Sequence, residues 1–338
     1  MKPNPSNSSK ITRKKFLNTC GSVLAGGSIA GVSAVLLHKS AKQNRGGVVP
    51  KDLQYAEGKP ALSPYRLTAS FGVADGIEGF ELWDDKLIVA SPNSICIYNL
   101  SGSLFNSFAV SNDVRDIAVD NGLVYLLFPA RIEVFNMDGG QVCDWEACSD
   151  RSDYCSFAVA AGSVFVTDAS NKNICKYSTD GNFERFIQSP NGFVIPSYTF
   201  GIACIDGVVY CSNSGRHQVE MFTPDGEYIG FFGQPGAVAG RFCGCCNPVH
   251  LARTPTGEII TSEKGTPRIS CYGSDGQFRS VLLDHQALGG GNKAYDVKVQ
   301  GDRLFVAGKN MVSTFQYDKT QAAVGACSGC GVGCPLRG

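Results

Sequence analysis

The residues of this chain with the clearest capacity for chemistry are two groups of closely spaced cysteines. The first group lies near the C-terminus, among Gly and Ser residues that offer little to a hydrophobic core, and consists of Cys327, Cys330 and Cys334. The second lies in an internal Gly-rich stretch and consists of Cys243, Cys245 and Cys246. Thiols at this density bind metals or clusters, or pair as disulfides. Metal or cluster binding, disulfide pairing and a set of free thiols are the alternatives.

The C-terminal spacing, C-x2-C-x3-C-P, resembles the latter half of the ferredoxin-type ligand run, with one cysteine missing. A [4Fe-4S] cluster takes four thiolate ligands. The resemblance therefore implies such a cluster on the C-terminal group, with one of Cys243, Cys245 or Cys246 as the fourth ligand. Among the other cysteines, Cys143, Cys148 and Cys155 flank a loop and could pair. Five more lie in apolar alternating runs and are predicted to fill the core: Cys96, Cys175, Cys204, Cys211 and Cys271.

The N-terminal segment is typical of an export signal or membrane anchor. Residues 12–17 resemble the twin-arginine signal, with Lys14 in place of the second Arg, which implies export of a folded, cofactor-loaded protein. The apolar stretch 16–37 has 22 residues, enough to span a bilayer, and no clear cleavage site follows it. We therefore expect residues 1–41 to be an uncleaved anchor, with the rest of the chain on the extracytoplasmic, periplasmic side. Cleavage and release into the periplasm is the alternative.

The rest of the chain must position the thiols, and it is organised as repeats. Residues 42–64 form a linker. After it, short turns recur at intervals of 37 to 50 residues, and most of them are Asp-Gly: Ser101–Gly102, Asp138–Gly139, Asp180–Gly181, Asp225–Gly226, Asp275–Gly276 and Asp318–Lys319. Asp-Gly suits a tight hairpin, and a period of about 40 residues with four short strands is typical of a β-propeller blade. The sequence therefore predicts an all-β, six-bladed propeller over residues 65–320, followed by a Cys-rich tail, 321–338.

Three of these units, at 164–181, 208–226 and 259–276, resemble NHL repeats. The innermost strands are predicted to begin near Phe80, Val114, Ser156, Phe200, Pro248 and Ala294. The sixth unit lacks an outer strand of its own, and residues 65–71 could supply it and close the ring. Residues 320–326 compete for that edge. In that position they would lead the C-terminal cysteines toward the internal group.

Related propellers include zinc lyases and calcium lactonases, which place metal ligands in the central channel. Asp116, His250 and Asp296 occupy comparable inner-strand positions here, so they could bind calcium or zinc, with plain polar lining of the channel as the alternative. The 338-residue chain has a net charge of zero, which argues against a nucleic-acid partner.

These observations favour a membrane-tethered binding or scaffold component of a redox assembly, with protein partners and a possible iron–sulfur cluster. The alternatives are a lactonase- or lyase-type enzyme with a cation in the channel, and a disulfide-stapled surface binding protein.

Overall fold

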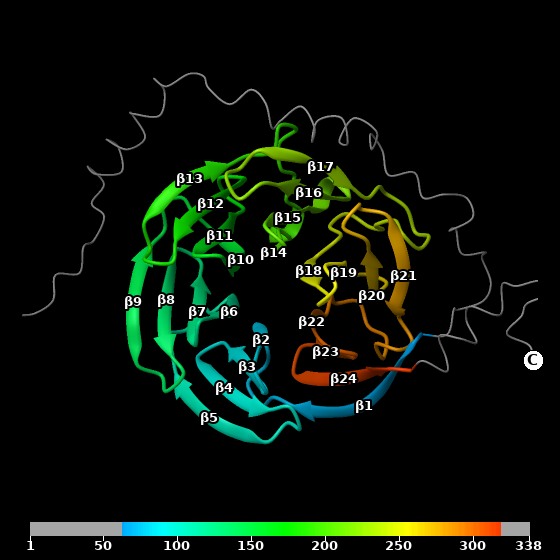
Figure 1. The fold of residues 1–338 in the computed structure, drawn as a ribbon, viewed down its shortest axis with the longest axis horizontal. Helices are drawn as coiled ribbons and strands as arrows, with labels where there is room; N and C mark the ends of the chain where they lie inside the picture. Colours follow the sequence, from blue (N-terminus) through cyan, green and yellow to red (C-terminus); the bar gives the residue numbers. More distant parts are fainter. Residues whose placement is uncertain (1–62, 319–338) are drawn as a thin grey trace, which may run out of the picture.

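Short runs of alternating apolar and polar residues, separated by turns that often contain Gly, determine the architecture. In the computed structural model, which describes residues 63–318, these runs form six antiparallel sheets of four strands each, arranged as blades around a central axis (Figure 1). The six-bladed β-propeller predicted from the sequence is confirmed. The innermost strands begin within two residues of their predicted starts.

In blades 1 to 3 the chain runs from the innermost strand outward. Blade 1 contains β2 (Gly79–Trp83), β3 (Lys86–Ser91), β4 (Ser94–Asn99) and β5 (Leu104–Ala109). Blade 2 contains β6 (Asp116–Asp120), β7 (Leu123–Phe128), β8 (Arg131–Asn136) and β9 (Gln141–Glu146). Blade 3 contains β10 (Tyr154–Ala160), β11 (Ser163–Asp168), β12 (Asn173–Ser178) and β13 (Phe183–Ile187).

Blades 4 and 5 follow the same order. Blade 4 contains β14 (Ile202–Ile205), β15 (Val208–Asn213), β16 (Gln218–Phe222) and β17 (Tyr228–Phe232). Blade 5 contains β18 (His250–Arg253), β19 (Ile259–Glu263), β20 (Arg268–Tyr272) and β21 (Phe278–Leu283). Two single-turn helices, η2 (Pro196–Tyr198) and η3 (Ser214–Arg216), lie in the loops before and within blade 4.

Blade 6 is built from both ends of the described chain. Its inner three strands are β22 (Asp296–Gln300), β23 (Arg303–Ala307) and β24 (Met311–Tyr317), and its outer strand is β1 (Tyr65–Gly72). β1 pairs with β24 from Tyr65 opposite Tyr317 to Gly72 opposite Met311. The predicted ring closure is confirmed. β1 occupies this edge of β24, and residues 320–326, the alternative outer strand, lie outside the described residues.

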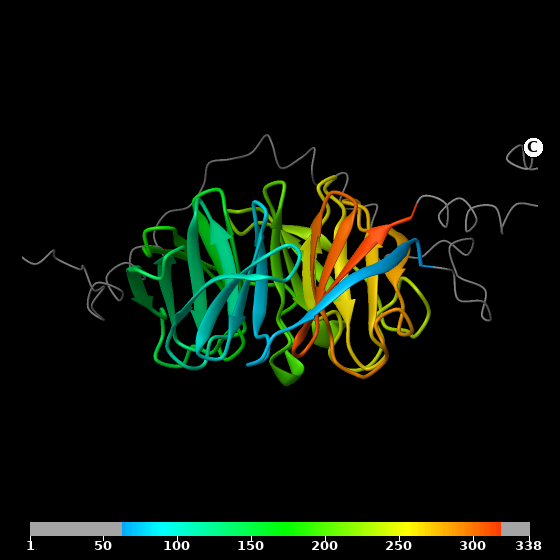
Figure 2. The same cartoon turned by 90° about the horizontal axis from the view of Figure 1, so that it is seen from below.

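The antiparallel blades give the propeller two distinct faces (Figure 2). The hairpins between third and fourth strands lie on one face, which we call the hairpin face. The connections from each outer strand to the next inner strand lie on the opposite face, which we call the connection face. Residues 233–249, which include the internal cysteine group, form the connection from β17 to β18 and therefore belong to the connection face.

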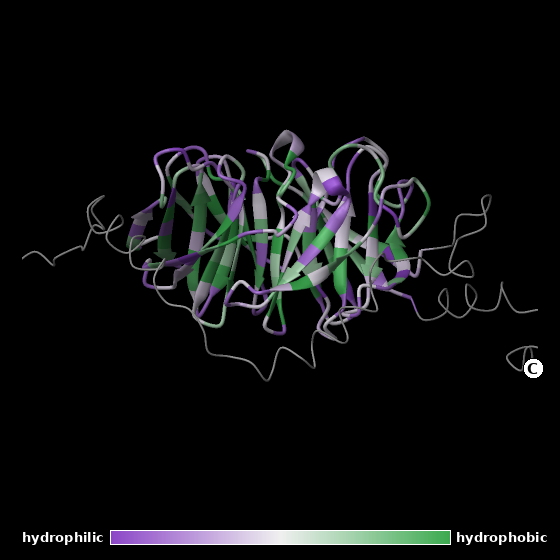
Figure 3. Ribbon diagram, turned by 90° about the horizontal axis from the view of Figure 1, so that it is seen from above, coloured by the Kyte–Doolittle hydropathy of each residue, from purple (hydrophilic) through white to green (hydrophobic). Residues whose placement is uncertain are grey.

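The hydrophobic core lies between the blades. Hydrophobic residues recur along the strands of every blade (Figure 3). Their buried side chains form six clusters, each shared by two successive blades. The cluster between blades 2 and 3, for example, contains Leu127 and Tyr154, both fully buried. Because each blade is packed on both sides, the inner strands and the polar side chains that they carry are held at fixed positions around the axis.

Several sequence predictions lie outside residues 63–318: the N-terminal signal or anchor, most of the linker, and the tail that holds Cys327, Cys330 and Cys334. Within the part of the chain that the structure describes, no helix has the length and apolar character needed to cross a membrane.

Candidate functional site

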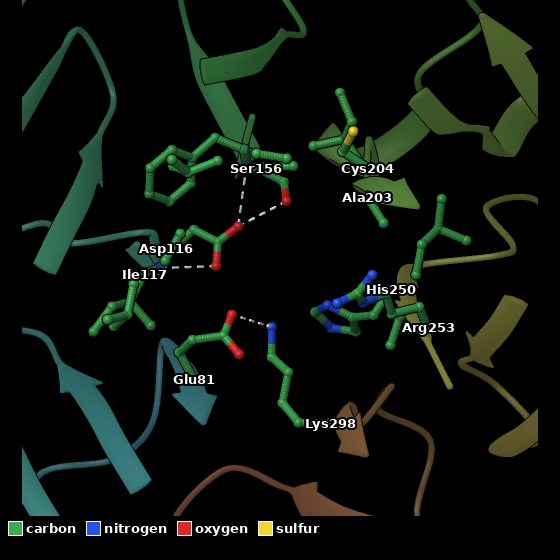
Figure 4. A pocket seen from close by; sticks show the side chains of 18 of the residues that line it. Glu81, Asp116, Ile117, Ser156, Ala203, Cys204, His250, Arg253 and Lys298 are labelled. Atoms are coloured by element: carbon green, nitrogen blue, oxygen red, sulfur yellow. Dashed lines mark hydrogen bonds and ion pairs between the residues drawn. The ribbon is translucent and has the colours of Figure 1, made fainter. Parts of the chain in front are cut away.

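The propeller axis holds a cavity of about 500 Å³. It is lined by the inner strands of all six blades, and Figure 4 shows the Glu81, Asp116, His250 and Lys298 side chains pointing into it. Asp116 and His250 are the first residues of β6 and β18, so both lie at the connection-face end of the channel. Glu81 and Lys298 are the third residues of β2 and β22, one layer deeper.

Asp116 is held by donors from its own blade and the next. Its Oδ2 atom accepts hydrogen bonds from Ser156 Oγ at 2.7 Å and from the Phe157 backbone N–H at 3.3 Å, and its Oδ1 atom accepts one from the Ile117 N–H at 2.9 Å. Burial raises the pKa of the Asp116 carboxyl to about 6, with a further contribution from the Asp296 carboxylate, although Lys298 and these hydrogen bonds oppose the rise. Asp116 therefore holds a proton in mildly acidic solution.

Lys298 is the central cation of the channel. Its Nζ atom lies 3.1 Å from Glu81 Oε2. Burial alone would lower the pKa of the Lys298 ammonium, but the carboxyl groups of Glu81, Asp296 and Asp116 outweigh it, so the pKa is raised above its usual value. Three carboxyl groups thus surround one ammonium group. Of these four residues, only Asp116 and Asp296 were predicted as site residues from the sequence.

His250 contributes the neutral base of the channel. Burial lowers the pKa of its imidazole, and the ammonium groups of Lys298 and Lys264 lower it further against the opposing effect of Asp296. The imidazole lines the channel cavity, where a bound molecule could reach it. At neutral pH the ring is therefore an uncharged acceptor and donor.

The structure brings Asp116, His250 and Asp296 to the same cavity, as predicted, but not into a metal-binding geometry. Among the described residues, no group of three His, Cys, Asp or Glu side chains converges closely enough to hold a metal ion. One Asp116 oxygen is already engaged by Ser156 and Phe157. The calcium or zinc site suggested by the sequence is therefore not supported by the arrangement of these residues.

The loop that holds the internal cysteines is anchored firmly to blade 5. The buried amide of Asn247 donates to the Cys243 carbonyl at 2.6 Å and the Lys264 carbonyl at 2.9 Å, and accepts from the Lys264 N–H at 2.9 Å. Phe242 is fully buried against Tyr272. These contacts hold the cysteines beside the connection-face mouth of the channel.

Two of the three thiols meet in this loop. The Sγ atoms of Cys245 and Cys246 lie 3.1 Å apart; Cys245 is exposed and Cys246 is buried. Burial opposes ionisation of Cys246, but its contacts with Cys245, with the Lys264 ammonium and with Ser197 lower its pKa overall. Cys243 does not complete a three-thiol group. Because the tail cysteines lie outside the described residues, the shared [4Fe-4S] cluster stays a prediction.

A second thiol contact was not predicted from the sequence. Cys148, expected to pair with Cys143 or Cys155, instead lies with its Sγ 3.2 Å from that of Cys175, which was predicted to be a core residue only. Cys175 is indeed fully buried, but it faces the connection from β9 to β10. Sequence spacing could not reveal this contact because the two residues belong to different elements of the propeller.

Comparison with known proteins supports the fold and leaves the family open. No protein-family profile matches the chain, and no curated protein matches its sequence. The NHL resemblance therefore stays a prediction. Many solved structures resemble the propeller of this chain. A streptogramin B lyase matches 77% of this chain and 99% of its own, with a TM-score of 0.54 and 14% identity.

Two other enzymes share the architecture at similar distance. Virginiamycin B lyase from Staphylococcus aureus matches 75% of this chain and 99% of its own, with a TM-score of 0.52 and 13% identity. A luciferin-regenerating enzyme matches 72% of this chain and 92% of its own, with a TM-score of 0.53 and 13% identity. At these identities the likeness establishes the propeller fold alone.

Proposed function

We propose that this protein is an enzyme that performs acid–base chemistry of the hydrolase or lyase type on a small polar molecule bound in the central channel. The observation that carries the proposal is the pair formed by Asp116 and His250. The two groups open onto one cavity, and their surroundings make the carboxyl a weaker acid and the imidazole a weaker base than usual. Such a pair can hold a proton on one partner and accept one on the other near neutral pH.

In this scheme the neutral His250 imidazole takes a proton from water or from an acidic C–H group of the substrate. Asp116, in its protonated form, gives a proton to the leaving group. The Ser156 hydroxyl orients the Asp116 carboxyl, and the Lys298 ammonium stabilises negative charge that develops in the channel. With Asp116 protonated, the carboxyl groups of Glu81 and Asp296 still outnumber the Lys298 ammonium, which favours a substrate that carries an amine or another cationic group.

The fold is compatible with this assignment. Several structural relatives are named as enzymes, among them two lyases and a luciferin-regenerating enzyme. Their names add weight only to the class of chemistry and identify no substrate for this chain.

The test is an activity screen with a chromogenic acetate ester, a set of lactones and a set of amine-bearing esters. We expect turnover to peak in mildly acidic solution, because protonation of His250 abolishes it at lower pH and ionisation of Asp116 abolishes it at higher pH. His250→Gln and Asp116→Asn should each lower kcat about 100-fold or more. Asp180→Asn, on the hairpin face, is the matched control. Full activity in folded His250→Gln protein would contradict the proposal.

The redox scaffold is the second candidate. The paired sulfurs of Cys245 and Cys246 favour it, since they offer soft ligands on the connection face. In this proposal the N-terminal segment tethers the protein to the extracytoplasmic side of a membrane, protein partners bind the propeller, and the C-terminal cysteines complete a [4Fe-4S] site. Iron and acid-labile sulfide in anaerobically purified full-length protein would support it, and their absence would remove it.

A further inference from the structure

We propose that Cys148 and Cys175 form a reversible disulfide, a modification site that joins the connection between blades 2 and 3 to the third strand of blade 3. The Sγ atoms lie 3.2 Å apart, so a small movement of one side chain brings them to bonding distance. The site lies in the wall between two blades. It uses neither the channel residues nor the Cys243–Cys246 loop.

The local structure holds Cys148 in place. The Cys148 backbone N–H donates to the Tyr154 hydroxyl at 3.2 Å, and the preceding Ala147 N–H donates to the Ala130 carbonyl at 2.8 Å. Tyr154 is fully buried and its hydroxyl also contacts the Tyr177 hydroxyl. The connection is therefore fixed by a buried pair of tyrosines, and its cysteine is kept over Cys175.

The two thiols differ in the way that a reactive and a resolving cysteine differ. Cys148 is partly exposed, and its contact with Cys175 together with hydrogen bonds from Tyr177 and Tyr154 lowers its pKa to about 7 in spite of burial. Cys175 is fully buried, and the same contact and its burial raise its pKa well above the usual value. An external reagent can therefore reach Cys148 and meets it in the reactive thiolate form.

The oxidant in this proposal is a small-molecule disulfide such as glutathione disulfide. The Cys148 thiolate attacks one sulfur of the reagent, which forms a mixed disulfide and releases one thiolate. Cys175 then attacks Cys148 Sγ, releases the second thiolate and gives up its proton to it. Two protein thiols are thereby oxidised to one disulfide, and the two electrons pass to the reagent, which leaves as two thiols.

The disulfide would affect the channel wall through the connection from β9 to β10, which joins Cys148 to the inner strand that carries Ser156. The connection from β9 to β10 contains Asp153, which forms an ion pair with Arg115, the neighbour of Asp116. It leads directly into β10, which carries Ser156. A disulfide at Cys148 would therefore restrict the segment that aligns Ser156 with Asp116.

The experiment uses purified full-length protein. It is treated with glutathione disulfide, its remaining thiols are blocked with N-ethylmaleimide, and it is digested without reduction for peptide mass spectrometry. We expect one cross-linked product that joins the Cys148 and Cys175 peptides and disappears with dithiothreitol. The oxidised protein should also unfold at a midpoint roughly 5 °C higher than the reduced protein. Recovery of both cysteines as maleimide adducts, or of Cys148 joined to a different cysteine, would overturn the proposal.

Variants then separate the two roles. Cys175→Ala should trap glutathione on Cys148 as a stable mixed disulfide, because the resolving thiol is gone. Cys148→Ser should leave Cys175 unmodified and abolish the rise in the unfolding midpoint. Cys143→Ser, a partly exposed cysteine on β9, is the matched control and should keep the cross-link. The peptide map of the unaltered protein decides the question even if a variant fails to fold.

Discussion

The Ser156 hydroxyl of blade 3 donates a hydrogen bond to the Asp116 carboxyl of blade 2 across 2.7 Å. This bond stabilises the ionised carboxylate, and it limits the rise in pKa that burial causes. We therefore expect Ser156→Ala to raise the pKa of Asp116 above about 6. Carbon-13 NMR titration of carboxyl-labelled aspartates measures the change, with Ser103→Ala on the surface as control. An unchanged or lower pKa would show that the bond does not act on this carboxyl.

The raised pKa of Asp116 predicts a stability change with a defined sign. The folded protein holds the Asp116 proton up to about pH 6, whereas the unfolded chain releases it near the ordinary value of 3.8. The folded state therefore binds more protons between these values, and stability falls as the pH rises through this window, by about 1 to 3 kcal/mol in total.

Asp116→Asn should remove the part of the pH-dependent loss of stability that Asp116 causes. Urea unfolding at a series of pH values measures it, and the variant should equal or exceed the original protein in stability at pH 7. An identical pH slope in the two proteins would contradict the prediction.

Lys264 acts on two groups at once, because its ammonium lowers the pKa of both His250 and Cys246. Lys264→Met should therefore raise both pKa values together. Proton NMR of the imidazole and pH-dependent alkylation of the thiol, read by mass spectrometry, provide independent measurements. Lys293→Met, an exposed lysine, should change neither. A shift in only one of the two groups would show that Lys264 does not link the channel mouth to the cysteine loop.

The hairpin glycines pack against the outer strand of the preceding blade. A Cβ on Gly181 would lie 2.8 Å from the indole of Trp145, and the residue has a φ of +82°. We expect Gly181→Ala to destabilise the protein by about 2 kcal/mol or more, because it combines backbone strain with overlap. Gly162 has a similar φ of +76° in the same blade but open space around it, so Gly162→Ala should cost only about 1 kcal/mol. If urea unfolding showed equal losses of unfolding free energy for the two variants, overlap with Trp145 would not contribute to the cost at Gly181.

The fold was predictable because its signals are local. The Asp-Gly turns set the hairpins, and the alternation of residues 65–71 marked a strand without a partner in its own unit. The site was only half predictable. Asp116, His250 and Asp296 follow from their places at strand starts, but the Glu81–Lys298 ion pair joins blades 1 and 6, which meet only when the ring closes. The contact of Cys148 with Cys175 likewise depends on how one connection folds over its neighbouring blade.

The pairing of β1 with β24 has a consequence for how the protein folds during its synthesis. β1 is among the first parts of the propeller to leave the ribosome, yet its partner strand is the last. Until synthesis reaches β24, β1 can make none of its native ladder contacts, while blades 1 to 5 can each assemble as they emerge. Ring closure therefore joins the two segments of the propeller that are farthest apart in the sequence, and it can occur only after β24 has been synthesised. Most side chains of β1 are exposed even in the folded protein, so its place in blade 6 depends mainly on the backbone pairing with β24.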